Sequence, residues 1–170
     1  MVNIRNQKEI SLIRESSGIV FDVLESLNEL IIPGTSPKEL DSYAENFIKN
    51  NGAIPAFKGY MGFPATLCIS VNEEVVHGIP SERLLKNGDI VSIDCGVFKN
   101  GFYGDSARTY AVGKISKELN TLLNVTKKSL SLGIKNAKVG GRLSDIGYAI
   151  QTYVEKNGFS VVRDLVGHGI

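Results

Sequence analysis

The stretch IVSIDCGVFKNGFYGDSARTY, residues 90–110, predicts a β-hairpin around which the rest of the chain can be arranged. Two runs rich in β-branched and aromatic residues flank Asn100-Gly101. Asn-Gly is the strongest short-range signal for a tight hairpin turn. With these two residues at the centre of the turn, Lys99 faces Phe102, and this pairing sets the register of both strands.

The register places two aspartates on one face of the hairpin. Asp94 lies opposite Ala107 and Asp105 opposite Gly96, so the two backbones are diagonal neighbours about 7–8 Å apart. An inward carboxylate without a partner does not stabilise a strand, but two at this spacing can converge on one cation or on a pair of cations. The alternative is that one aspartate pairs with Arg108 or caps a turn.

Composition excludes several classes of protein. The chain of 170 residues has 19 Lys and Arg against 18 Asp and Glu, so we expect no direct nucleic-acid binding and no attraction to an anionic membrane. No apolar run reaches the roughly 20 residues that span a bilayer, and residues 1–8 are too polar for a signal peptide. Cys68 and Cys95 lie in separate apolar runs, which argues against a disulfide framework. A cytoplasmic protein with one hydrophobic core is expected.

Helices are expected on both sides of the hairpin. Asn6 with Glu9, and Ser36-Pro37 with Glu39, form capping-box patterns at the start of two amphipathic segments. The other expected elements are helices over about 116–137 and 143–156, strands around 66–71 and 74–77, and a β-rich segment over 159–166.

The helical segments repeat within the chain. The segment 34–52 matches 140–158 at a constant offset, and both end in Asn-Gly. The repeat predicts a single incomplete domain, with one full structural half and the helical opening of a second. The alternative is chance, because amphipathic helices that end in Asn-Gly are common.

Two histidines complete the set of candidate ligands. His77 precedes Gly78, and His168 lies between two glycines; glycine allows close approach of the backbone to a ligand. Asp94, Asp105 and His168 together offer oxygen and nitrogen donors that suit Mn, Fe, Co or Zn better than Ca. The alternative is that each histidine is an ordinary surface or core residue.

The chain resembles the type I methionine aminopeptidases along its whole length. The resemblance rests on GFP at 62–64 with CISVNE at 68–73, HGIP at 77–80, GDIV at 88–91 followed by Ile93-Asp94, and GFYGD at 101–105. It implies an α/β (α+β) pita-bread fold of the creatinase and aminopeptidase type, here the N-terminal half and the start of the pseudo-symmetric second half.

The resemblance also implies roles for single residues. Asp94 is expected to chelate one of two divalent ions (Co, Mn, Fe or Zn), Asp105 to bridge both, and His168 to bind the other. His77 is expected to contact the scissile peptide as a catalytic and substrate-binding residue. A water bridging such a metal pair would attack the first peptide bond.

Three further residues are implied to bind the methionine side chain: Tyr60, Phe63 and Cys68. An apolar, polarisable lining suits an unbranched thioether. The alternative for all three is ordinary packing in a loop or a buried strand.

The implied function is removal of N-terminal methionine from nascent proteins, with peptide N-termini as substrates and the ribosome as a further partner. In the family, a second substrate-contacting histidine and two glutamate ligands follow the segment matching Gly167-His168-Gly169. We therefore expect weak metal binding and negligible peptidase activity for these 170 residues alone. The alternative function is a non-catalytic pita-bread module that binds peptides or ribosomes.

Overall fold

The computed structural model describes residues 3–170, which residue contacts divide into two compact units. The first unit runs to Ile115 and also includes Ile170, and the second comprises Ser116–Gly169. Among the residues described, no helix is both long and apolar enough to cross a membrane.

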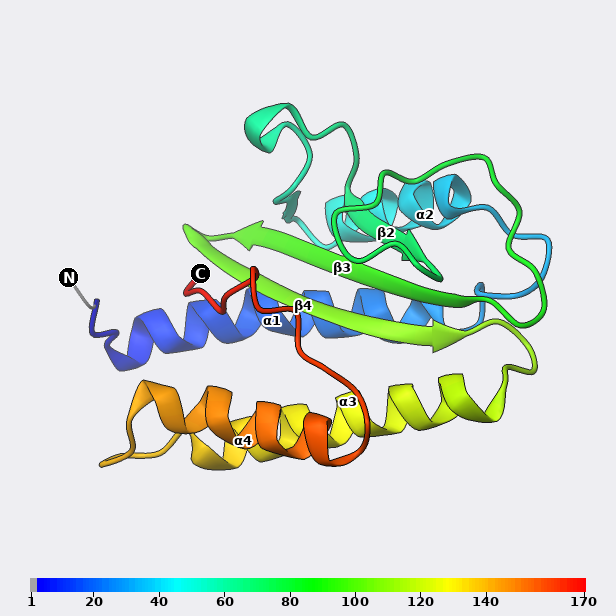
Figure 1. The fold of residues 1–170 in the computed structure, drawn as a ribbon. Helices are drawn as coiled ribbons and strands as arrows, with labels where there is room; N and C mark the ends of the chain where they lie inside the picture. Colours follow the sequence, from blue (N-terminus) through cyan, green and yellow to red (C-terminus); the bar gives the residue numbers. More distant parts are fainter. Residues whose placement is uncertain (1–2) are drawn as a thin grey trace. The chain divides into compact units, whose positions relative to one another are not determined.

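The first unit is a four-stranded antiparallel sheet with two helices packed on it (Figure 1). The central strand β3 pairs with β4 on one side and with β1 and β2 on the other. The elements in chain order are α1 (Gln7–Leu27), α2 (Pro37–Asn50), β1 (Ile54–Pro55), the 3-10 turn η1 (Tyr60–Gly62), β2 (Leu67–Val71), β3 (Ile90–Lys99) and β4 (Phe102–Ala111).

The predicted hairpin register is confirmed. Lys99 pairs with Phe102, and the pairing continues without interruption to Ile90 and Ala111. Asn100 and Gly101 have φ angles of 51° and 85°, as a two-residue turn matched to the twist of the strands requires.

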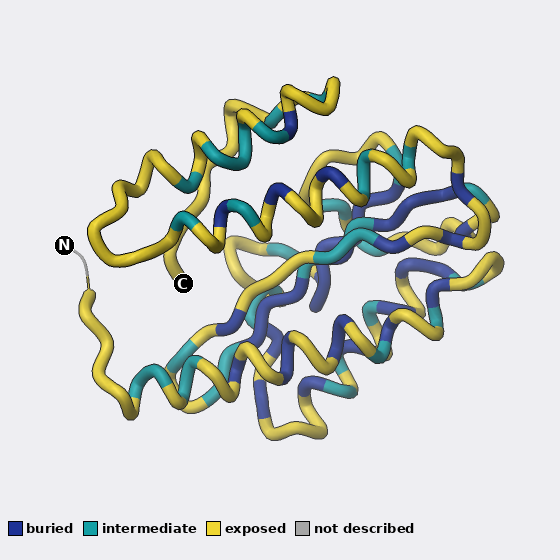
Figure 2. Tube along the Cα trace, turned by 90° about the horizontal axis from the view of Figure 1, so that it is seen from below, coloured by how far each residue is buried: buried dark blue, intermediate teal, exposed yellow. Residues whose placement is uncertain are grey.

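One face of the sheet forms the hydrophobic core with α1 and α2. Val91, Ile93, Cys95 and Val97 alternate along β3 and are completely buried. They pack with the apolar sides of both helices, including Val23, Leu27, Leu40 and Ile48. Figure 2 shows buried positions running through the strands and recurring along the helices that cover them. Because side chains alternate across a strand, Ser92, Asp94 and Gly96 belong to the opposite face.

Both predicted capping boxes are confirmed. The side chain of Asn6 accepts a hydrogen bond from the Glu9 N–H and the Glu9 carboxylate accepts one from the Asn6 N–H. Ser36 and Glu39 make the same reciprocal pair before α2.

Two predicted β segments are wrong. No strand forms at 74–77, where the Glu74 carboxylate accepts the Val71 N–H at 2.8 Å and closes a turn. Residues 159–166 also contain no strand. Both segments have β-forming side chains, but a strand needs a partner backbone, and no strand of residues 3–170 pairs with either.

The second unit contains α3 (Lys117–Asn136) and α4 (Leu143–Lys156). The helices approach closely at Gly133, where an added Cβ would lie 2.8 Å from the Ile150 Cδ1 atom. α4 begins and ends 106 residues after α2 does, which is the offset of the repeat found in the sequence.

The hydroxyl of Tyr110 links β4 to α1. Its buried O–H donates to the Leu24 carbonyl at 2.6 Å, and burial raises the pKa of Tyr110 to about 12. Tyr110→Phe should therefore cost about 1 kcal/mol of unfolding free energy at pH 7. Unfolded tyrosine ionises near 10. As the pH rises from about 10 to 12, Tyr110 ionises in the unfolded wild type before it ionises in the folded one, which lowers the unfolding free energy of the wild type. The difference in unfolding free energy between wild type and Tyr110→Phe should therefore shrink over this range.

Urea denaturation at pH 7 and pH 11 measures this difference. Tyr148→Phe is the matched control, because Tyr148 is 74% exposed and its hydroxyl should not affect stability. A Tyr110→Phe variant as stable as wild type at pH 7 would show that the hydrogen bond does not stabilise the contact between α1 and β4.

Candidate functional site

The two predicted carboxylates lie on the same face of the hairpin. Asp94 pairs with Ala107 and Asp105 with Gly96, which places the two aspartate backbones about 7–8 Å apart as diagonal neighbours. Both are on the face opposite to α1 and α2, where Asp94 is half-buried and Asp105 exposed. The neighbouring hydroxyls of Ser92 and Thr109 are 2.8 Å apart, so this face is polar where the other is apolar.

Cys68 belongs to the same cluster. It pairs with Asp94 across β2 and β3, and side chains of directly paired residues lie on the same face. Burial raises the pKa of the Cys68 thiol to about 12, and the nearby carboxylates of Asp94, Asp105 and Asp41 add to the rise. The thiol is therefore neutral at physiological pH and provides a polarisable wall beside the carboxylates.

Asp41 attaches α2 to the start of β2. Its carboxylate accepts the N–H groups of Thr66 at 2.9 Å and of Leu67 at 2.7 Å. Burial raises the pKa of Asp41, and these two hydrogen bonds oppose the rise. This contact holds β2, the strand that carries Cys68, against α2.

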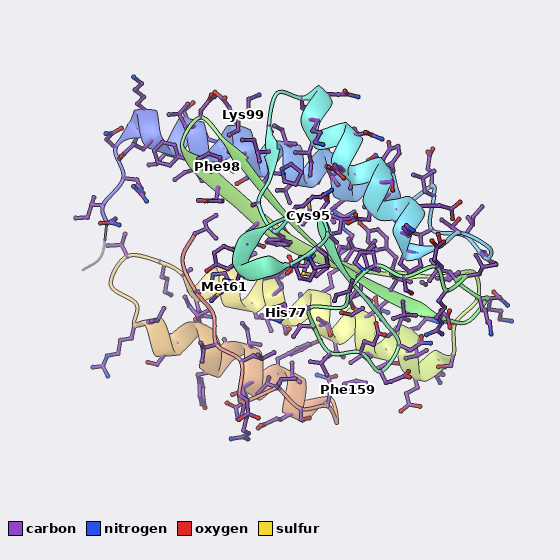
Figure 3. All side chains as sticks on the ribbon, turned by 90° about the horizontal axis from the view of Figure 1, so that it is seen from above. Met61, His77, Cys95, Phe98, Lys99 and Phe159 are labelled. Carbon is purple, nitrogen blue, oxygen red and sulfur yellow. The ribbon has the colours of Figure 1, made fainter. Side chains whose placement is uncertain are left out.

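His77 is exposed on the loop that follows β2 (Figure 3). Its φ angle is 57°, a left-handed conformation that non-glycine residues adopt at some cost. The next residue holds it there: the Gly78 carbonyl accepts the Ile69 N–H at 2.9 Å, and the Gly78 N–H donates to the Ser70 hydroxyl at 3.2 Å. A Cβ at Gly78 would lie 2.2 Å from the Ile69 carbonyl oxygen, so only glycine fits.

The predicted pocket residues differ in exposure. Tyr60 is 70% exposed on η1 and Phe63 is half-buried just after it. Met61, between them on η1, is 91% exposed (Figure 3). Aromatic and thioether side chains are therefore available on the segment that precedes β2.

Phe57 is a candidate site residue that the sequence analysis missed. An added Cβ at Gly96 would lie 2.4 Å from the Phe57 ring, so the ring covers the position between Asp94 and Phe98 on the carboxylate face. The available signal was Gly96 itself, since a glycine inside a strand often marks a close approach of another group.

His168 lies in the second unit and is exposed, with its Nδ1 atom 3.0 Å from the Gly169 carbonyl oxygen. Within residues 3–170, no three His, Cys, Asp or Glu side chains converge as a metal site. The donors present nevertheless fit part of such a site, because two carboxylates on one polar face offer the oxygen ligands that divalent ions take.

Comparison with known proteins relates this chain to peptidases. The sequence model of metallopeptidase family M24 matches residues 11–170. Methionine aminopeptidase from Clostridium perfringens is 54% identical over 170 residues, which are 100% of this chain and 68% of that protein. Methionine aminopeptidase 1 from Bacillus subtilis is 55% identical with the same coverage.

Solved structures give the same result. The crystal structure of methionine aminopeptidase from Rickettsia prowazekii matches with a TM-score of 0.98 at 41% identity, over 100% of this chain and 68% of that chain. A prolidase from Pyrococcus furiosus, 23% identical, matches with a TM-score of 0.82 over 91% of this chain and 44% of its own, which shows a shared fold. The predicted α/β fold of the pita-bread type is confirmed.

Proposed function

This chain belongs to metallopeptidase family M24, and from that membership we propose that it carries part of the active site of an enzyme that removes methionine from peptide N-termini. The chain is an aminopeptidase by resemblance to the relatives above. The family is one of metallopeptidases, which implies the use of a divalent metal ion.

The observation that supports this proposal best is the placement of Asp94 and Asp105. Both acids lie on the face of the sheet opposite to the hydrophobic core. A pair of carboxylates on a polar face, beside a buried thiol and an aromatic ring, suits a metal-assisted hydrolase with an apolar side-chain pocket.

The proposed ligands are Asp94, Asp105 and His168, and the proposed number of ions is two, with Mn, Fe, Co or Zn as candidates. When bound, the ions would supply Lewis-acid polarisation of a carbonyl group and an acidified water. His77 would donate a hydrogen bond to the scissile peptide from its loop anchored at Gly78. Tyr60, Phe63 and Cys68, with Phe57, would enclose the methionine side chain and exclude water.

We further propose that the two units belong to one domain built by internal duplication. The support is the coincidence of α2 and α4, which have the same length, the same offset at both ends, and a glycine of positive φ after each, Gly52 and Gly158.

The 170 residues alone should bind Mn²⁺ or Co²⁺ weakly and hydrolyse a Met-Ala peptide negligibly, because the hairpin supplies only two carboxylates. Calorimetric titration and a peptide cleavage assay measure both quantities, with an N-acetylated peptide as the control for exopeptidase action. Robust turnover would show that the assignment of further, missing ligands is wrong.

The second candidate function is a non-catalytic module that binds peptides or the ribosome. It is favoured by one observation, the exposure of the apolar side chains of Tyr60 and Met61 on η1, which a peptide could contact without a metal. Saturable binding of a methionine-initiated peptide in the presence of EDTA, with no detectable metal binding, would favour this module over the enzyme.

A further inference from the structure

The connection between β2 and β3 carries His77 (Figure 3). It leaves β2 after Val71, and Gly78 already returns to that strand, because its carbonyl accepts the Ile69 N–H at 2.9 Å. His77 therefore lies at the end of a short excursion of the chain. Its φ angle of 57° is one that a bulky residue keeps only where its surroundings hold it. Gly78 holds one side of the excursion, and the other side is the turn that follows Val71.

Asn72 fixes the direction in which the chain leaves β2. Its N–H donates to the Ile90 carbonyl at 3.0 Å, and its side-chain oxygen accepts the Ile90 N–H at 3.0 Å. Its side-chain nitrogen donates to the Asp89 carboxylate at 2.9 Å. The φ angle of Asn72 is 57°, a left-handed value that asparagine tolerates better than most residues. Three hydrogen bonds leave this residue little freedom, and the path of residues 73–77 starts from it.

Asp89 joins the two ends of the connection. Its side chain is nearly buried, one oxygen accepts the Asn72 amide, and the other accepts the Lys86 N–H at 3.0 Å. The Arg83 guanidinium is 3.7 Å away. Burial acts to raise the pKa of Asp89, but the hydrogen bonds from Asn72 and Lys86 and the charge of Arg83 hold it below its ordinary value. The carboxylate is therefore charged, and its hydrogen bonds are of the stronger, charge-assisted kind.

The segment that Asp89 binds is itself attached to the rest of the first unit. The Leu85 N–H donates to the Thr35 carbonyl, and the Leu85 carbonyl accepts the Gly34 N–H, both at 2.9 Å. The Leu85 side chain is buried in the hydrophobic core. Asp89 thus connects Asn72 to a part of the connection that is anchored on the core.

We propose that the pair of Asn72 and Asp89 positions His77, by fixing the turn at Asn72 so that His77 keeps one backbone conformation. This inference deepens the proposed function and rests on it for the role of His77 at the scissile peptide. Neither Asn72 nor Asp89 contacts substrate in this role; both act through the residues between Asn72 and His77. A catalytic side chain that is held in place before substrate binds does not have to be ordered during the reaction.

Exchanging the two side chains tests the pair. In Asp89→Asn, one N–H of the new amide faces another donor, either the Asn72 amide or the Lys86 N–H. In Asn72→Asp, two carboxylates face each other. The double variant Asn72→Asp/Asp89→Asn restores the match of donors and acceptors. The carboxylate at position 72 can accept the Ile90 N–H and the amide at position 89, and the oxygen of that amide can accept the Lys86 N–H.

Nuclear magnetic resonance of the 170-residue chain in EDTA provides two readouts. Amide hydrogen exchange at Ile69, measured relative to amides inside α1, should be at least about tenfold faster in each single variant, because one hydrogen bond to a charged group is lost. The double variant should return to within about threefold of wild type. The ring signal of His77 should shift in each single variant and return in the double variant. His168, the other histidine of the chain, lies in the second unit and is the internal control.

Glu73→Gln is the matched control. It removes a carboxylate from an exposed position of the same turn and should leave both readouts unchanged. Asn72→Gly is used if either single variant fails to fold, since glycine accepts the left-handed backbone and Asp89 keeps its bond to the Lys86 N–H. It should also speed exchange at Ile69.

Folded single variants with a lower unfolding free energy, but with the His77 signal and the Ile69 exchange rate of wild type, would show that the pair only stabilises the fold. That result would overturn the proposal, and so would a double variant as perturbed as the single ones. Neither readout requires a bound metal or peptidase activity. Failure of the proposed function would appear instead in the metal titration and the cleavage assay.

Discussion

Asp105→Asn should weaken Mn²⁺ binding by at least about tenfold, with little effect on folding. An amide of the same shape keeps one oxygen donor but loses the negative charge that attracts a divalent ion. Even residues that only orient a metal ligand change affinity by roughly 10–100-fold, so the loss of a carboxylate ligand should reach that range. Asp105 is exposed on β4, so its replacement should not disturb the core.

Calorimetric titration with Mn²⁺ measures this effect, and a thermal melt with and without the ion checks it independently. Asp22→Asn removes a carboxylate from an exposed position of α1 and is the matched control for the change in net charge. Asp94→Asn should act in the same direction as Asp105→Asn. Equal affinity in wild type and in both site variants would disprove the assignment of this face as a metal site.

The placement of these acids was predictable because it depends on a local signal. Asn100-Gly101 determines the turn, the turn determines the register, and the register determines which side chains share a face. The helix starts at Asn6 and Ser36 were predictable for the same reason, since a capping box involves residues only three apart.

Features that depend on distant partners were not predictable in this way. Residues 74–77 have β-forming side chains, yet the turn closed by Glu74 and the left-handed His77 prevent a strand. Phe57 lies over Gly96 although some forty positions separate them in the chain, and only the glycine hinted at a close approach. A pattern in one segment cannot specify which other segment will cover it.

Gly104 illustrates how one small residue positions the site. An added Cβ would lie 2.6 Å from the Ser16 carbonyl carbon and from the Ser17 nitrogen, so α1 rests directly on β4 at this point. The buried Ser16 hydroxyl strengthens the contact by donating to the Phe102 carbonyl at 3.0 Å. Asp105 is the next residue in the strand, so its position depends on this contact between α1 and β4.

Gly104→Ala should destabilise the protein by about 1–3 kcal/mol, because the methyl group meets backbone atoms that cannot rotate away. Urea denaturation measures the loss. Gly18→Ala is the matched control: the same methyl group, added to α1 itself, meets nothing within 4 Å and should stabilise the protein by about 0.5–1 kcal/mol. If the unfolding free energy falls in Gly104→Ala and rises in Gly18→Ala, the close packing of α1 on β4, rather than the flexibility of glycine, keeps β4 and Asp105 in place. If Gly104→Ala were as stable as wild type, α1 would have to be free to move away from the sheet, and Asp105 would lack the support inferred here.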